Sequence, residues 1–299
     1  MRKQVLFCLL FAWLVLGFSP QALAQETVAD SLISLELSDG SILRGTIVSE
    51  DADTVTFITS AGIKITMPKS TIATRSVTRG RMVEGRFHRF DPNYTRLLFA
   101  PTGRPLRKGE GYFTDYYVFF PGVAYGLTDH ISIMAGISVL PGVGLGEQML
   151  FVAPRYGTEI SEMFALSGGF LYMNFGGEFS TGLAFATGTY GTQEKCFTAG
   201  IGLGYTYNEN DAGNKEFEFA KHPIFVWGGN IRLSNSISFV SENWIITGEN
   251  FDMGFQPFSI ALRFFGEHIA VDAGAIIMLE ILEEGFPIPW LSFVYNFGG

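Results

Sequence analysis

Alternation of apolar with small or polar residues dominates the chain from Tyr94 to its end. In 195–207, Phe197, Ala199 and Ile201 share one parity, while glycine and threonine are frequent on the other. Because successive side chains of a strand point to opposite faces, this period predicts β-strands. Turn signals separate twelve predicted strands: 93–101, 112–126, 130–140, 149–158, 163–174, 181–191, 195–207, 221–233, 236–247, 255–265, 268–279 and 288–297.

The connections between these strands alternate in length. Every second one is short (127–129, 159–162, 192–194, 234–235 and 266–267), and those between are mostly longer and richer in polar residues or glycine. An even strand number with this alternation is typical of outer-membrane β-barrels, whose short turns face the periplasm. A large soluble β core is the alternative, but its outer face would carry many Lys and Glu. The small, glycine-rich face suits a lumen instead, so 93–299 is predicted to be a 12-stranded antiparallel transmembrane barrel.

The first 24 residues have the features of a signal peptide. Arg2 and Lys3 precede an apolar run, and Ala22-Leu23-Ala24 is a small-residue cleavage site. Removing Arg2 and Lys3 from the 20 basic residues leaves 18 against 29 acidic ones, a formal charge of −11. This charge argues against a nucleic-acid partner. Export and the barrel pattern together predict a Gram-negative outer-membrane location, with lipid as a partner.

Residues 31–75 form a separate small β unit, with turn signals at Asp39-Gly40 and Ala61-Gly62. Its pattern of "DGS" hairpin and "GIKITMP" strand resembles small Sm-like or SH3-like barrels. Such a unit is either a plain structural module or a periplasmic domain that docks a protein partner. An arginine-rich linker, 76–92, follows; it is either simply solvated or attracted to anionic head groups.

Chemistry-bearing motifs are few. His130 and Ser132 are spaced as in the outer-membrane phospholipase family, but Ile133-Met134 replaces the Asn-Gly that follows there. The remaining histidines are scattered, no His/Asp/Glu group has metal-ligand spacing, and no cofactor motif is present. We therefore expect no enzyme, no metal and no cofactor; a lipid-active enzyme is a remote alternative.

Charged residues on the inward parity are the main candidate for a functional site. They are Arg96, Arg155, Arg232, Glu242, Arg263 and Asp272. Twelve strands fall between eight, where side chains fill a barrel, and 16 to 18, where a channel is open. The residues therefore form either an ion-pair network in a plugged lumen or the cationic mouth of a narrow pore that favours anions.

The terminal strand, 290–297, resembles the C-terminal signal by which the barrel assembly machinery recognises outer-membrane proteins. Tyr295 and Phe297 match its hydrophobic positions, whereas Trp290 stands in place of a polar residue and Ser292 in place of glycine. The function predicted from all these features is a narrow channel for small, preferentially anionic solutes. A membrane-anchored adaptor, whose small domain docks a periplasmic partner, is the alternative.

Overall fold

The computed structural model describes residues 31–83, 86–176, 179–209 and 215–298. The predicted signal peptide lies outside these residues. The chain divides into two compact units, Met1–His88 and Arg89–Gly299, and both are β-structures. Among the described residues, no helix has the length and apolar character needed for a helical membrane crossing.

The first unit is a six-stranded sheet of order β4-β3-β2-β1-β5-β6. Its strands are β1 (Ser31–Leu37), β2 (Ile42–Glu50), β3 (Thr54–Thr59), β4 (Lys64–Pro68), β5 (Ile72–Val83) and β6 (Arg86–Arg89), with a 3-10 turn, η1 (Lys69–Thr71). Leu35, Phe57 and Met67 form its core. The segment expected to be a linker, 76–92, is therefore largely strand, and likeness to Sm or SH3 barrels stays a prediction.

Exposed ionic contacts join the end of β2 to η1 and to β5 in this unit. Glu50 pairs with Lys69 at 3.0 Å and with Arg75 at 3.1 Å. Hydrogen bonds from Lys69 and then Arg75 hold the pKa of the Glu50 carboxyl below its ordinary value. Because these side chains are exposed, the contacts contribute little to stability.

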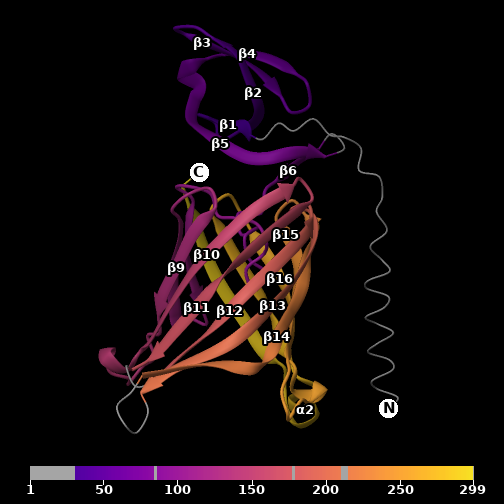
Figure 1. The fold of residues 1–299 in the computed structure, drawn as a ribbon. Helices are drawn as coiled ribbons and strands as arrows, with labels where there is room; N and C mark the ends of the chain where they lie inside the picture. Colours follow the sequence, from indigo (N-terminus) through magenta and orange to yellow (C-terminus); the bar gives the residue numbers. More distant parts are fainter. Residues whose placement is uncertain (1–30, 84–85, 177–178, 210–214, 299) are drawn as a thin grey trace. The chain divides into compact units, whose positions relative to one another are not determined.

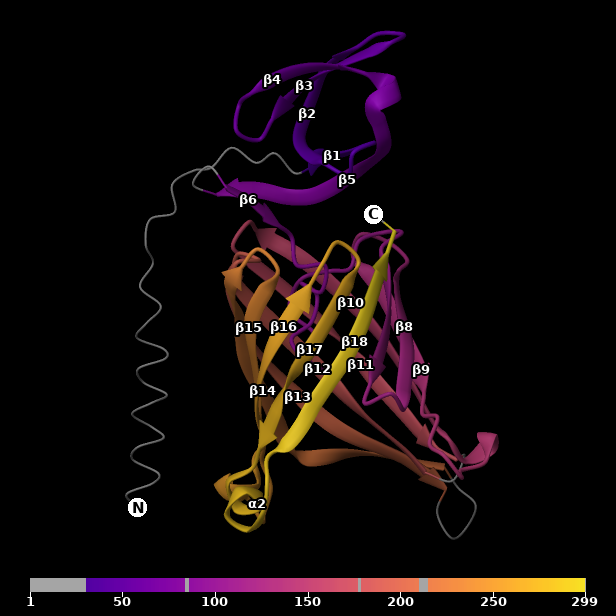
Figure 2. The ribbon, with the colours of Figure 1, turned by 180° about the vertical axis from the view of Figure 1, so that it is seen from behind.

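The second unit is a closed barrel of twelve antiparallel strands (Figures 1 and 2). The strands are β7 (Gly111–Tyr116), β8 (Phe120–Gly126), β9 (Ile131–Ile137), β10 (Met149–Ser161), β11 (Phe164–Phe175), β12 (Phe179–Gly191), β13 (Lys195–Glu209), β14 (Lys215–Ser234), β15 (Ile237–Ile246), β16 (Phe258–Phe265), β17 (Ile269–Ile277) and β18 (Ile288–Phe297). Three short helical turns, η2 (Leu145–Glu147), η3 (Met253–Phe255) and α2 (Leu279–Glu284), lie in connections. Pairing of β18 with β7 closes the barrel.

The predicted strand number is confirmed, but two of the predicted strands are wrong. Residues 93–101 form no strand; they belong to a segment inside the barrel. The predicted strand 112–126 is instead the hairpin of β7 and β8, which reverses at Tyr117 (φ 56°) and Val118 (φ 69°). The two errors cancel in the count. The other ten predicted segments correspond to β9 through β18.

The chain reverses at 127–130, 162–163, 192–194, 235–236 and 266–268 at one end of the barrel, which we call the short-turn rim. β7 begins and β18 ends at this rim. Alternation places aliphatic and aromatic side chains on the outer face; on β18 these include Leu291, Phe293 and Tyr295, which are 39–46% exposed. The opposite parity faces the lumen.

Candidate functional site

A segment that we call the strap, residues 89–110, occupies the lumen at the short-turn half of the barrel. It folds back on itself through a bridge between Arg96 and Pro101. Leu97 and Leu98 are each 1% exposed, whereas Phe99 at the tip of the fold is 45% exposed. After Arg89, which ends β6, none of the described strap residues belongs to a sheet, so its backbone groups need other hydrogen-bonding partners. Inward side chains of the barrel supply them.

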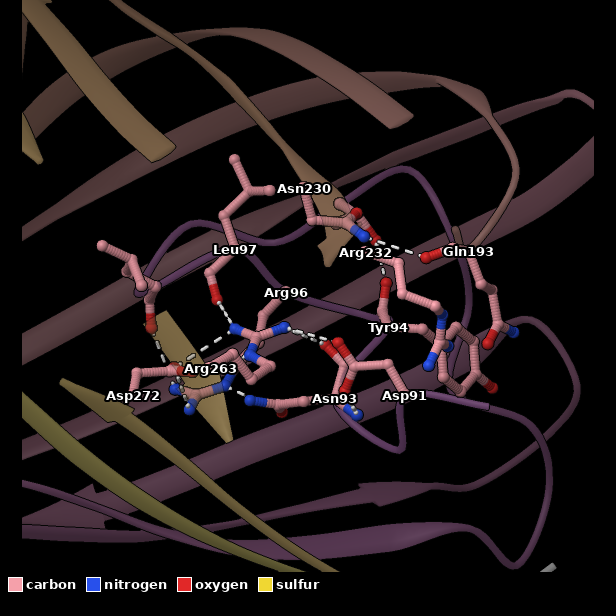
Figure 3. Close-up of polar contacts among 12 residues, drawn as sticks. Asp91, Asn93, Tyr94, Arg96, Leu97, Gln193, Asn230, Arg232, Arg263 and Asp272 are labelled. Carbon is pink, nitrogen blue, oxygen red and sulfur yellow. Dashed lines mark hydrogen bonds and ion pairs between the residues drawn. The ribbon is translucent and has the colours of Figure 1, made fainter. Parts of the chain in front are cut away.

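Arg263 and Asp272 form the centre of the polar contacts shown in Figure 3. They lie directly opposite each other on β16 and β17, and Arg263 Nε is 2.6 Å from Asp272 Oδ1. Arg263 also reaches the strap, with Nη1 3.1 Å from Asp91 Oδ2 and Nη2 2.5 Å from the Leu97 carbonyl. Both side chains are almost completely buried. This buried pair thus joins the barrel wall to the strap.

Arg96 comes from the strap and not, as predicted, from a strand. Its Nη2 is 3.6 Å from Asp272 Oδ2, and its Nη1 donates to the Tyr116 hydroxyl at 2.6 Å. The Ser292 hydroxyl on β18 donates to the same Asp272 oxygen at 3.1 Å. Asp272 therefore carries two guanidinium groups and one hydroxyl, which offsets its removal from water.

Glu242 on β15 has a different role from the expected ion pair with an arginine. Its Oε2 accepts the backbone N–H groups of Leu98, Phe99 and Ala100 at 3.0, 2.9 and 2.8 Å. Its Oε1 accepts the indole N–H of Trp244 at 2.8 Å. A carboxylate with three converging amides satisfies donors of the turn that would otherwise be buried without a partner. Glu242 thereby fixes the tip of the strap.

Arg155 and Arg232 also bind the strap, but in unlike surroundings. Arg155 on β10 donates to the carbonyls of Thr95, Thr102 and Arg104 at 3.1–3.4 Å. Arg232 on β14 donates to the Arg89 carbonyl at 2.6 Å and pairs with Glu194. The structure thus brings all six charged residues to the lumen. Around the strap they act mainly as its hydrogen-bonding partners.

Beyond the strap tip the lumen is hollow and mostly apolar. One space, the mid-lumen cavity, has a volume of about 100 Å³; its lining includes Arg96, Arg155, Leu183, Phe185, Val226 and Trp244. A second, the mouth cavity, has a volume of about 240 Å³ and is lined by residues that include Tyr116, Phe120, Met149, Met173 and Trp290. Phe99, Phe151 and Leu171 line both cavities. Sequence reasoning missed these cavities. The available signal was that Leu183, Phe185 and Val226 are large apolar residues at inward positions, where small residues are frequent elsewhere.

The structure also places the residues of the predicted assembly signal. Trp290 and Ser292 point into the lumen, where they are 9% and 1% exposed, and Tyr295 is on the outer face. Phe297 lies opposite Gly111 at the last rung between β18 and β7. A role in assembly stays a prediction, since geometry alone does not address recognition.

His130 and Ser132 do not contact each other in the described structure. His130 Nδ1 is 3.1 Å from the Gly157 carbonyl, and its ring stacks on Tyr156. Within the ranges that the structure describes, no group of three His, Cys, Asp or Glu residues could hold a metal ion. His130 thus contacts β10, at Tyr156 and Gly157.

No protein-family model and no curated protein matches the chain. The barrel resembles two solved porins. The NanC porin structure, in a rhombohedral crystal form, has a TM-score of 0.41 and 7% identity, with 63% of this chain and 97% of that chain covered. The KdgM porin in complex with disordered oligogalacturonate has a TM-score of 0.38 and 8% identity, with 63% and 95% covered. These values are too low to assign the chain to either family.

Proposed function

We propose that the barrel spans the outer membrane, with the short-turn rim in the periplasm. The apolar outer face supports this location, because soluble proteins rarely expose contiguous apolar patches larger than a few hundred Å². Cell fractionation and gel migration test it. The protein should be recovered with outer membranes and should migrate faster unheated than heated; recovery in the soluble periplasmic fraction would contradict the proposal.

Within that membrane, the protein is a transport protein for small solutes that is closed by the strap, and anions are favoured over cations. The observation that carries this function is the seating of a loop segment in the lumen, mostly through hydrogen bonds to its backbone, with buried ion pairs at Asp91 and Arg96. Such bonds are exchangeable with water, and each contributes only about 0.5–1.5 kcal/mol net, or about 1.5–3 kcal/mol when one partner is charged. Displacing the strap would leave inward arginines facing the vacated space.

Conductance across planar bilayers tests the function. The unmodified chain should show low conductance, because the strap occupies the lumen. Glu242→Ala removes the acceptor of three amides at the tip and should give larger or more frequent conductance steps. Glu249→Ala is the control, since Glu249 is exposed in the connection after β15.

Reversal potential in a salt gradient then measures ion preference, which should favour anions. The folding of each variant is checked by its gel migration before heating. Conductance that stays absent in the folded Glu242→Ala variant at all applied voltages would refute transport by strap displacement.

A second role, as an adaptor, is favoured by one observation on the first unit. Ile42, Val48 and Ile58 are exposed by 54%, 54% and 36% on its sheet. In cells, a photo-cross-linker placed at Ile58 should give one discrete adduct if a partner docks there. The same cross-linker at Lys64, which lies opposite Ile58 on the neighbouring strand, shows how far the contact surface extends. Absence of an adduct at both positions would remove the support for this role.

A further inference from the structure

Arg155 differs from Arg96, the other charged residue that lines the mid-lumen cavity. Arg96 has the Asp272 carboxylate at 3.6 Å. In the described part of the chain, Arg155 has three carbonyl contacts and no carboxylate partner. A guanidinium carries five N–H donors, so these contacts leave donors over. A cation that is removed from bulk water without a counter-charge is costly unless an anion joins it.

The walls beyond Arg155 have the opposite character. On the inward face of β10, Ala153 lies next to Arg155 and Phe151 lies two residues further toward the start of the strand, where it lines both cavities. The Phe151 ring fits there because residue 136 is glycine: a Cβ on Gly136 would lie 2.2 Å from the ring. Phe99 and Leu171 continue this apolar path to the mouth cavity.

A guanidinium without a carboxylate partner at the inner end of an apolar path has the features of a binding site for an amphipathic anion. The two cavities together reach the lower end of the usual range for small-molecule pockets, about 300–1,000 Å³. A sugar acid would leave many hydroxyl groups facing Phe151, Leu171 and Phe185 without hydrogen-bonding partners. An aliphatic chain loses nothing there and gains from burial of its apolar surface.

We infer that the lumen beyond the strap binds an aliphatic carboxylate, with the carboxylate on Arg155 and the chain along Phe99, Phe151 and Leu171 toward Trp290. This site rests on the proposed function, since it would hold the solute of the same lumen. Arginine matches the geometry of a carboxylate through two parallel hydrogen bonds. The chain then fills the space between the strap tip and the barrel wall.

Tryptophan fluorescence offers a direct assay. The full chain contains four tryptophans. Trp13→Phe and Trp227→Phe leave Trp244 and Trp290, and each of these lines one of the cavities. This chain is placed in phosphatidylcholine vesicles at pH 8 and titrated with bromoundecanoate, whose bromine quenches tryptophan. Methyl bromoundecanoate, which lacks the charge, and vesicles of brominated phosphatidylcholine are the two comparison probes.

Bromoundecanoate should quench saturably. Arg155→Gln should weaken its binding about 10- to 100-fold, the range of a charge-assisted hydrogen bond, while exposed Arg107→Gln should not. Ala153→Phe should reduce quenching by filling the cavity. Its control, Ala135→Phe, changes an alanine of the outward parity on β9. Gel migration before heating confirms that each variant is folded. If Arg155→Gln does not fold, the comparison with the methyl ester and the Ala153→Phe variant test the site instead.

Equal binding of the methyl ester would overturn the role of Arg155. Quenching by brominated phosphatidylcholine alone would show that a bilayer lipid chain, not a free carboxylate, reaches the cavity, and would also overturn the inference. Absence of saturable quenching would dispose of the site. Conductance separates this result from the proposed function. If the protein conducts but does not bind bromoundecanoate, the carboxylate site is wrong and the transport function stands. If it binds bromoundecanoate but does not conduct, the site stands and the transport function is wrong.

Discussion

Asp272→Asn tests whether the buried charges hold the strap in the barrel. The Asp272 carboxylate is 1% exposed, and it receives Arg263 Nε at 2.6 Å, Arg263 Nη2 at 3.2 Å and the Ser292 hydroxyl at 3.1 Å. Asparagine has nearly the same shape but no charge, and one of its polar atoms is a donor that would face another donor. Arg263 and Arg96 would then lose the negative charge that both of them contact.

The expected loss can be estimated from the contacts that remain. Removing one partner of a buried ion pair typically costs about 3–5 kcal/mol. Arg263 would keep Asp91 at 3.1 Å and the carbonyls of Asn93 and Leu97. We therefore expect a loss at the lower end, about 3 kcal/mol in the free energy of unfolding.

Urea unfolding of the protein in lipid vesicles, followed by tryptophan fluorescence, measures this loss. Asp129→Asn is the matched control, because Asp129 is exposed in the β8–β9 turn and accepts the Lys108 amide at 3.2 Å. Such an exposed change should stay within about 0.5 kcal/mol. If Asp272→Asn also shifts the free energy by less than about 1 kcal/mol, the charge network does not hold the strap and the reasoning fails.

Two further predictions concern the wall and the terminus of the barrel. Gly136→Ala should destabilise the barrel by about 1–3 kcal/mol in the same urea assay, since the new Cβ would overlap the Phe151 ring; Gly146→Ala, which meets open space, should be neutral, and equal effects would contradict the packing account. Phe297→Asp should sharply reduce the amount of folded protein in the outer membrane. The direct lipid cost near an interface is only about 0–1 kcal/mol, so a large loss would be due to impaired recognition by the assembly machinery, and normal assembly would remove the assembly-signal assignment.

The strands from β9 to β18 were predictable because their period is simple. Each crosses from one rim to the other with apolar side chains on one parity, and the terminal strand was placed at 288–297, as observed. The hairpin of β7 and β8 was not predictable by the same means. Hairpin turns whose two central residues have positive φ normally use Asn-Gly or a similar pair there. Here Tyr117 and Val118 adopt that conformation, and no glycine, asparagine or proline marks the turn.

The strap was mistaken for a strand for a related reason. It folds back inside the barrel, so Leu97 and Leu98 are buried as strand residues are. Its prolines were the available signal: Pro92, Pro101 and Pro105 lie within 14 residues and cannot donate to a strand ladder. A segment interrupted this often fits an irregular path through a lumen better than a barrel wall.

Parity could place the charged residues of the barrel strands in the lumen, but it could not identify their partners, and it did not apply to Arg96 on the strap. The strands fix which residues face inward, and the register also fixes that Arg263 lies opposite Asp272. The partner of Glu242 is a set of three backbone amides, and backbone amides leave no mark in a sequence. Arginines were the basic residues predicted to face the lumen, and so the sequence suggested an ion pair between Glu242 and an arginine. In the structure, Glu242 binds the backbone of the strap tip, and Asp272 pairs with Arg96 and Arg263. Because both of these carboxylates are bound in this way, Arg155 has no carboxylate partner among the described residues, and it lies beside the apolar half of the lumen.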